Sequence, residues 1–337
     1  MAARVFKIIS TLLMVLIPIL GHPQTIRVGH FPNITHAQAV VGRGNGWFEK
    51  ALGPSAKIQW TTFHAGPSAI EALFAGAIDL AYVGPNPALT GYIKSHGEAL
   101  RIIAGSCSGG AGLVVRADSG IQKPEDFHGK RVASPQLANT QDVALRAWLR
   151  AHNLQLREKG GDVQVLPIAN ADQLNLFLKK QLDAAWAPEP WVSRLVHDAM
   201  GRLFLDERQL WPNGQFATTE LVVSTKFLNE HPDLVEKWIR AHVELTDWIN
   251  HNLQQAKQVL NAEIKKETNA ALAPAILDDS FSRLQVTYDP LRSSMLTSAK
   301  SAFDEGFLGK QMPDMSGLYD LSILNRVLKE KGRKAIQ

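Results

Sequence analysis

The sequence has a single cysteine, Cys107, which rules out an internal disulfide framework and a cysteine-rich metal site. Charge of one sign is also scarce, because the formal net charge is only +4 over 337 residues and like charges do not gather in blocks. This balance is not typical of a nucleic-acid-binding surface, and we expect no nucleic-acid partner. Cys107 is best explained as a small buried hydrophobic side chain.

Motifs of the common catalytic sites are missing as well. Gly129-Lys130 is followed by Arg131, where a phosphate-binding loop needs the Ser or Thr that holds magnesium. The sequence contains no H-E-x-x-H pair, and the segment 105–109 has Cys107 at the centre of what would be a nucleophile elbow. We therefore expect no catalytic residues, no cofactor and no metal, and the chain is not predicted to be an enzyme.

One alternative on metals stays open. His30, His36 and His64 could meet near a cleft, and three imidazoles can bind a metal ion. No supporting carboxylate spacing accompanies them.

Long hydrophobic runs are scarce too, apart from Ile8 to Leu20, which Arg4 and Lys7 precede. This layout is typical of a secretory signal peptide, and a run of roughly 13 residues is too short to cross a bilayer comfortably. We predict a signal peptide over residues 1–24, cut between Gly21 and Gln24, and hence an exported, periplasmic protein. An uncleaved membrane anchor is the alternative.

Strand and helix patterns alternate along the rest of the chain. Strands are predicted over residues 26–30, 57–63, 78–83, 101–105 and 112–116, with a Gly-rich linker over 106–111. A second unit begins near Ile121, and a strand over 216–224 returns to the first unit. The expected architecture is α/β, with largely parallel sheets covered by helices on both faces and a chain that crosses between units twice.

The stretch from Ala65 to Tyr92 holds two predicted helix starts joined by a strand. Gly66, Pro67 and Ser68 open one helix, Ser68 and Glu71 have the spacing of a capping box, and a second helix begins after Gly84. Helix N-termini carry unpaired N–H groups and partial positive charge, so they favour small anions. The pattern predicts an anion receptor.

Several segments together resemble the periplasmic substrate-binding proteins of ABC importers in the sulfonate, nitrate and taurine group. The resemblance covers most of the chain after the predicted signal peptide. The matching segments are GNGWFEKAL (44–52), GPSAIEALFAGAIDLAYVGPNPAL (66–89), PEDFHGKRVAS (124–134), LDAAWAPEPW (182–191) and HPDLVEKWIRA (231–241).

The resemblance implies a type II periplasmic-binding-protein fold, with two lobes joined by two crossing strands and a ligand cleft between them. Lobe 1 would comprise residues 25–118 and 216–337, and lobe 2 residues 119–215. It also implies a monomer that closes on a small anion, most simply an aliphatic sulfonate, and delivers it to a membrane permease. Taurine, nitrate or a thiamine precursor stay open as ligands, as does an enzyme of thiamine- or pyrimidine-precursor type on the same fold.

Ligands of α/β sheets bind beyond the carboxyl ends of the strands, so the loops after each strand supply the candidate contacts. Each has a structural alternative: Ser68, Asn139 and Asn33 could be helix caps only, Trp186 a core aromatic, and Glu189 a structural carboxylate unless the ligand carries an amine. The predicted ligand-binding residues are Asn33, Thr35, His36, Gly66, Pro67, Ser68, Gly84, Asn86, Asn139, Thr140, Gln141, Trp186, Glu189 and Thr218.

Overall fold

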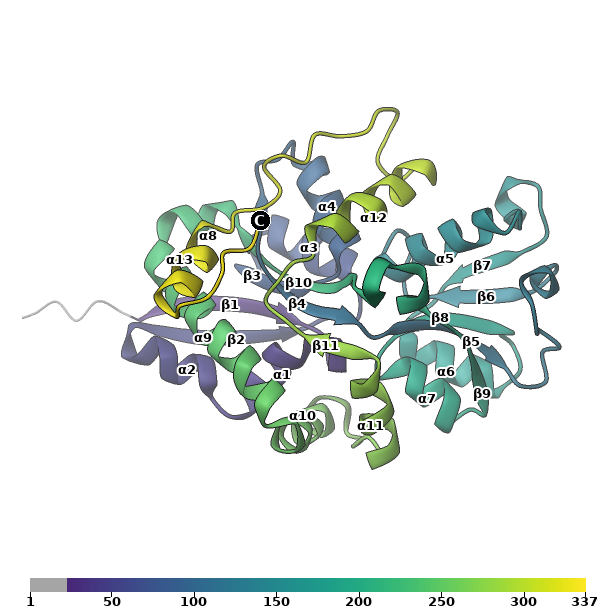
Figure 1. Cartoon of the computed structure of the whole chain (residues 1–337), viewed down its shortest axis with the longest axis horizontal. Helices are drawn as coiled ribbons and strands as arrows, with labels where there is room; N and C mark the ends of the chain where they lie inside the picture. Colours follow the sequence, from purple (N-terminus) through teal and green to yellow (C-terminus); the bar gives the residue numbers. More distant parts are fainter. Residues whose placement is uncertain (1–22) are drawn as a thin grey trace, which may run out of the picture.

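The computed structural model describes residues 23–337, which form two α/β lobes lying side by side (Figure 1). The two-lobe α/β architecture predicted from the sequence is confirmed. The predicted signal peptide lies outside the described residues except for its last two positions. From residue 23 onward, the structure contains no helix with the length and apolar character that crossing a membrane requires.

The first lobe is built on a six-stranded sheet with the order β11-β4-β10-β3-β1-β2. Strands β1, β2 and β3 run parallel, whereas β10 is antiparallel to both β3 and β4, and β11 is antiparallel to β4. The strands are β1 (Gln24–His30), β2 (Ala56–Thr62), β3 (Leu80–Val83), β4 (Leu100–Gly109), β10 (Ala217–Ser224) and β11 (Leu284–Val286).

Helices cover both faces of this sheet because its strands are buried on both sides. Tyr82 points into a core formed with α1, α2, α9, α10 and α13, while its neighbour Val83 points into a core formed with α3, α4 and α12. The helices are α1 (Ala37–Gly44), α2 (Trp47–Leu52), α3 (Gly66–Phe74), α4 (Pro85–Lys94), α8 (Thr225–Glu230), α9 (Pro232–His251), α10 (Leu253–Thr268), α11 (Pro274–Ser282), α12 (Arg292–Asp304) and α13 (Ser322–Glu330).

The second lobe has a five-stranded sheet with the order β7-β6-β8-β5-β9, in which α5 packs on one face and α6 and α7 on the other. Its strands are β5 (Ala111–Arg116), β6 (Arg131–Ser134), β7 (Gln164–Pro167), β8 (Ala184–Pro188) and β9 (Gly201–Asp206). Its helices are α5 (Thr140–Ala151), α6 (Asn170–Leu178) and α7 (Trp191–His197). Short 3-10 turns are η1 (Ile34–His36), η2 (Gly53–Ser55), η3 (Pro124–Phe127), η4 (Arg157–Lys159), η5 (Glu207–Leu210) and η6 (Pro212–Gly214).

Two details of the sheets differ from the expectation. The sheets are mixed and not largely parallel, because β10, β11 and β5 pair antiparallel with their neighbours. The Gly-rich segment predicted as a linker belongs mostly to β4, since β10 and β11 hydrogen-bond to it from both sides.

The first crossing between the lobes lies at Gly109 and Gly110. Both have positive φ, +74° and +75°, and a Cβ on Gly109 would lie 2.7 Å from the Arg283 carbonyl oxygen, so glycine is required there. Strand β5, which begins at Ala111, belongs to the second sheet. The crossing therefore lies before residue 111 and not at the expected boundary of 118. The return crossing runs from β9 through η5 and η6 to β10, close to the expected position.

Candidate functional site

A small polar cavity lies where the two lobes meet, at the carboxyl ends of β1, β3, β6 and β8. Its volume is about 30 Å³, room for roughly two water molecules. Most of the predicted ligand-binding residues line it: Asn33, Thr35, His36, Gly66, Gly84, Asn139, Thr140, Gln141 and Thr218. The remaining lining residues are Phe31, Pro87, Pro188 and Thr219. We call this space the polar cavity.

Three helices begin at the polar cavity: α3 and α4 from the first lobe and α5 from the second. Pro67, Pro85 and Pro87 each lack an N–H, so the first turns of α3 and α4 offer fewer backbone donors than a typical helix start. The two lobes approach closely here, because a Cβ on Gly84 would lie 2.4 Å from Thr140 Oγ1. Gly84 thus lets the start of α4 meet the start of α5.

Two hydroxyl groups in the lining lack a hydrogen-bond partner. Thr140 Oγ1 and Thr219 Oγ1 are both buried and unpaired, whereas the Thr218 hydroxyl donates to the Gly109 carbonyl at 2.5 Å. Asn139 caps α5, since its side-chain oxygen accepts a hydrogen bond from the Asp142 amide at 2.8 Å. Buried polar groups are rarely left unpaired in native proteins, so the two threonine hydroxyls are available donors for a ligand.

The lining of the polar cavity carries no Lys, Arg, Asp or Glu. Its one titratable residue is His36, and burial with a nearby His30 lowers the pKa of His36 well below 6.5, so its ring is neutral at pH 7. The ring stacks on Phe31 with centroids 4.3 Å apart, and its Nδ1 accepts a hydrogen bond from the Phe31 amide. The cavity therefore presents neutral dipoles, which can hold an anion without a formal countercharge.

Five predicted ligand-binding residues lie away from the polar cavity: Pro67, Ser68, Asn86, Trp186 and Glu189. Helix α3 is capped at Ala65, and the Ser68 hydroxyl donates to the Ala65 carbonyl at 2.9 Å, so the predicted capping box is wrong. The Asn86 side-chain oxygen accepts a hydrogen bond from Ser298 of α12 at 2.7 Å, which turns that side chain toward α12.

Trp186 and Glu189 have the structural roles that the sequence left open as alternatives to ligand binding. Trp186 is buried in the core beneath α5, and its indole N–H donates to Glu207 at 2.8 Å. Glu189 is buried too, and its carboxylate accepts hydrogen bonds from Ser193, from Ser280 at 2.9 Å and from Arg283 at 2.9 Å. Because Ser280 and Arg283 belong to the first lobe, Glu189 contributes to the contact between lobes.

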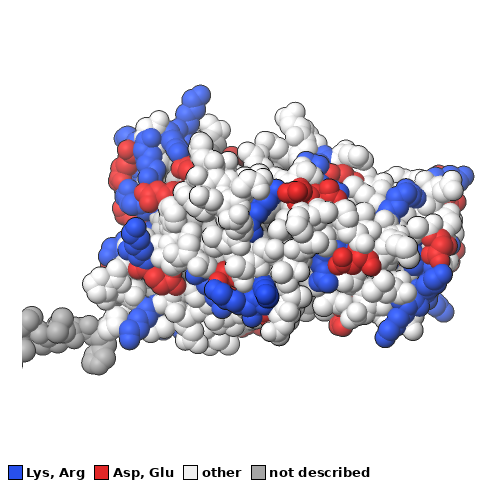
Figure 2. All heavy atoms as spheres, turned by 90° about the horizontal axis from the view of Figure 1, so that it is seen from below, with Lys and Arg blue, Asp and Glu red and all other residues white. Residues whose placement is uncertain are grey.

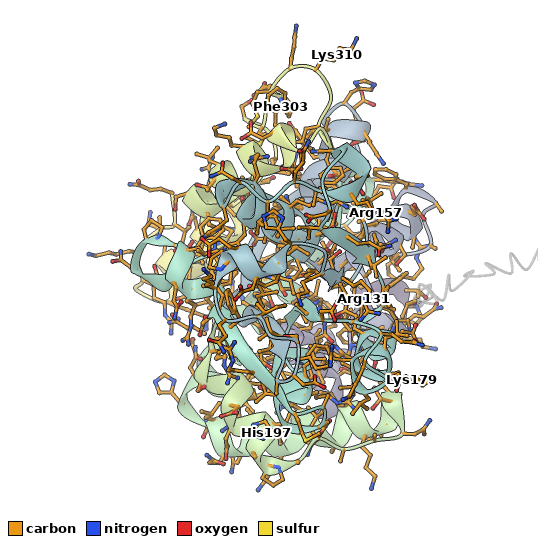
Figure 3. The ribbon with its side chains drawn as sticks, turned by 90° about the vertical axis from the view of Figure 1, so that its right-hand side faces the viewer. Arg131, Arg157, Lys179, His197, Phe303 and Lys310 are labelled. Atoms are coloured by element: carbon orange, nitrogen blue, oxygen red, sulfur yellow. The ribbon has the colours of Figure 1, made fainter. Side chains whose placement is uncertain are left out.

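Further contacts hold the lobes together on both sides of the polar cavity. The Trp191 indole N–H donates to the Asn33 side-chain oxygen at 3.0 Å, and His197 of α7 lies 2.5 Å from Asp279 of α11. In Figure 3, which looks onto the second lobe, His197 lies at the bottom, while Phe303 of α12 lies near the top. Beside Phe303 along α12 is Asp304, which pairs with Arg150 of α5 at 3.3 Å. The structure is thus a closed arrangement of the two lobes.

The histidines predicted as an alternative metal site do not form one. His30 Nε2 lies 3.0 Å from Glu267, and His36 Nδ1 faces a backbone amide. Residues 23–337 contain no group of three His, Cys, Asp or Glu side chains placed to hold a metal ion. Cys107 is buried as predicted, and burial raises the pKa of its thiol.

The molecular surface offers no strong charge of one sign on the face shown in Figure 2, where Lys and Arg are interspersed with Asp and Glu over both lobes.

The predicted set of ligand-binding residues omits four residues of the lining. Thr219 follows the predicted Thr218 directly, and Pro188 ends β8, where the rule on strand ends also selected Glu189. Phe31 also follows a strand, and its apolar ring gave no sign of a ligand role. Pro87 faces Gly66, where a Cβ would lie 2.3 Å from the Pro87 ring.

Comparisons with known proteins agree with this fold. The model of the NMT1-like family matches residues 21–264. A Bacillus subtilis protein named for aliphatic sulfonate binding is 23% identical over 296 residues, covering 86% of this chain and 85% of its own length. The taurine-binding periplasmic protein of Escherichia coli is 25% identical over 235 residues, covering 70% of each chain.

Among solved structures, the alkanesulfonate-binding protein SsuA from Xanthomonas axonopodis pv. citri, bound to MOPS, superposes with a TM-score of 0.73. It is 21% identical, and the match covers 89% of this chain and 99% of that one. At this identity the likeness concerns the fold. The resemblance to the sulfonate, nitrate and taurine group noted from the sequence is thereby confirmed.

Proposed function

Because the chain belongs to the NMT1-like family, we propose that it is the periplasmic substrate-binding component of an ABC importer for small anions. It captures an organic sulfonate in the polar cavity by closing its two lobes, and the closed form presents the ligand to a membrane permease. The relatives named for sulfonate and taurine binding support this assignment. The observation that carries it is the polar cavity, where helix starts from both lobes and two unpaired threonine hydroxyls meet without any formal charge.

The ligand is expected to be a permanent anion with several acceptor oxygens. A sulfonate stays ionised over the physiological pH range, and its three oxygens can accept hydrogen bonds from Thr140, Thr219 and the first N–H groups of α5. Because hydrogen bonds to a charged group are worth about 1.5–3 kcal/mol each, a few of them suffice to hold the head group.

Taurine fits this site less well than an unsubstituted sulfonate. Its amine would need a carboxylate partner, and Glu189, the predicted partner, is already engaged by Arg283, Ser193 and Ser280. We therefore expect an organic sulfonate without an amine to bind more tightly than taurine.

Isothermal titration calorimetry and thermal shift on the purified protein test the proposal. A sulfonate such as ethanesulfonate should bind and raise the melting temperature, because a ligand at 100 times its Kd stabilises the folded state by about 2.7 kcal/mol. Binding of sugars or cations with no binding of sulfonate, taurine, nitrate or bicarbonate would refute the anion proposal.

Single substitutions test the place of binding. Thr140→Ala should weaken sulfonate binding roughly 10- to 100-fold, since it removes one hydroxyl donor to the anion while Asn139 still caps α5. Ser68→Ala is the matched control, because the Ser68 hydroxyl bonds to Ala65 outside the cavity. Equal losses of affinity in the two variants would exclude the polar cavity as the head-group site.

A further inference from the structure

A second, larger pocket adjoins the polar cavity and is lined mainly by apolar groups. Its volume is about 230 Å³, and it lies between α5 of the second lobe and α12 of the first, which Figure 1 shows next to each other above the crossing strands. Thr140 lines both spaces. In addition, Pro85 of this pocket directly follows Gly84 of the polar cavity, and Ala217 of this pocket directly precedes Thr218 of the polar cavity. We call it the side pocket.

One face of α5 supplies the apolar wall of the side pocket. Its residues follow Thr140 at alternating steps of three and one along the helix, so they share one side of it: Val143, Ala144, Ala147 and Trp148. Serine and threonine side chains of α12 also line the pocket, as does Phe216, whose ring stacks on Trp211 with centroids 5.3 Å apart and 13° between planes. The small alanines leave the space open, and the aromatic rings give it flat apolar sides.

The single carboxylate in the lining is not free to bind a cation. Glu207 is buried, and its two oxygens accept hydrogen bonds from the indole N–H groups of Trp186 at 2.8 Å and Trp211 at 3.4 Å. The side pocket is therefore suited to a neutral apolar group and not to an ammonium group.

A buried unpaired donor lies at the junction of the two spaces. Thr140 is only 6% exposed and its hydroxyl has no partner, so an anion bound beside it would complete the hydrogen bonding of that residue. Asn86 has a buried, unpaired side-chain N–H₂ group as well, and its oxygen is held by Ser298, which lines the side pocket. Unpaired buried donors thus lie at the end of the side pocket that adjoins the polar cavity, although α12 also lines the pocket with the hydroxyl-bearing residues Ser294, Thr297, Ser298 and Ser301.

The two volumes assign different parts of one ligand to the two spaces. The polar cavity, at about 30 Å³, has room only for a small head group, whereas the side pocket exceeds the roughly 150 Å³ cavity that can hold benzene. Three other surface pockets share no lining residue with the polar cavity. A ligand with an apolar body therefore extends along α5.

We propose that the ligand is an organic sulfonate with a neutral, ring-sized apolar body, which lies in the side pocket while the sulfonate occupies the polar cavity. This inference rests on the proposed function and names its substrate class. Burial of the body adds affinity through the apolar area removed from water, whereas the head group sets the requirement for an anion.

Calorimetry with methanesulfonate, benzenesulfonate and benzyltrimethylammonium tests the inference. The purified protein should bind benzenesulfonate at least tenfold more tightly than methanesulfonate, and it should not bind benzyltrimethylammonium, which has the ring but no anionic head. Ala147→Phe fills the side pocket from α5, so it should reduce the preference for benzenesulfonate at least tenfold. Ala171→Phe, at an exposed position of α6 in the same lobe, is the matched control and should leave the preference unchanged.

The outcomes separate this inference from the proposed function. Equal affinity for methanesulfonate and benzenesulfonate, or an unchanged preference in Ala147→Phe, would overturn the side-pocket assignment and leave the anion receptor intact. Binding of benzyltrimethylammonium would overturn it too, because the pocket would then accept a cation. If neither sulfonate binds, the proposed function fails and the inference fails with it.

Discussion

Replacing Gly84 by alanine tests how the lobes close around the ligand. The added Cβ would lie 2.4 Å from Thr140 Oγ1, whereas 3.4 Å is an ordinary contact, so the starts of α4 and α5 would have to separate by about 1 Å. Gly84 has a φ of −65°, so alanine fits its backbone, and either lobe alone should keep its stability. Rotation of the Thr140 side chain would relieve the contact only by moving its hydroxyl away from the ligand.

The expected size of the effect follows from the cost of overpacking. Inserting a methyl group into a packed contact costs about 1–3 kcal/mol, which is roughly 5- to 140-fold in Kd when only the closed, liganded state bears it. Calorimetry measures the affinity, and small-angle X-ray scattering should show that the variant is less compact with saturating ligand than the wild type.

A double-mutant cycle identifies the contact that is responsible. With Thr140→Ala in the background, the nearest remaining atom to the new Cβ is the Cβ at position 140, at 3.4 Å, so Gly84→Ala should then cost little further affinity. The reasoning is refuted if Gly84→Ala weakens binding equally in both backgrounds, or if the Gly84→Ala variant binds the ligand as tightly as the wild type does. In either case the helix starts do not approach on closure.

Two further predictions concern buried charges. Burial raises the pKa of Glu207 to about 7 from an ordinary 4.5, so the folded state holds this proton more tightly than the unfolded state does. The protonated carboxyl group therefore stabilises the fold fully below pH 4.5. This stabilisation, about 3 kcal/mol, is lost as the pH rises through 7. Glu207→Gln should remove that loss from urea unfolding curves taken at pH 4.5–8, and identical pH profiles for the two proteins would contradict the assignment. Arg283→Met removes the charged partner of buried Glu189 and should lower the free energy of unfolding by about 3 kcal/mol, whereas adding Glu189→Gln should restore much of it. No recovery in the double variant would argue against an unpaired carboxylate as the cause.

Local patterns predicted the residues of the polar cavity that follow strand ends. Asn33 follows β1, Gly84 follows β3, and Asn139 caps the helix after β6, so the rule on carboxyl ends was enough to find them. The same rule misplaced Trp186, because the alternation of β8 turns its side chain toward α5 and away from the cleft. Choosing between the two faces requires knowing which helices pack on each face of the sheet, which sequence spacing does not contain.

Contacts between distant segments could not be predicted. Asn86 is turned aside by Ser298, which lies 212 residues later, and Glu189 is engaged by Arg283, 94 residues later. The Gly-rich end of β4 has low strand propensity, and only its pairing with β10 and β11 makes it a strand. The side pocket likewise needs α12 packed on α5, an arrangement with no local sequence signal.

The interlobe contacts also affect how long a bound ligand stays in the protein. With the lobes closed, the polar cavity is too small for a ligand to pass, so the residence time of a bound ligand depends on how often the lobes separate. The pairs that Arg150 and Lys159 make with Asp304 and Glu305 have exposed cationic side chains and are screened by salt, whereas the Glu189–Arg283 pair is buried and is screened much less. Rising ionic strength should therefore shorten the residence time of a bound ligand, while the buried pair continues to stabilise the closed form.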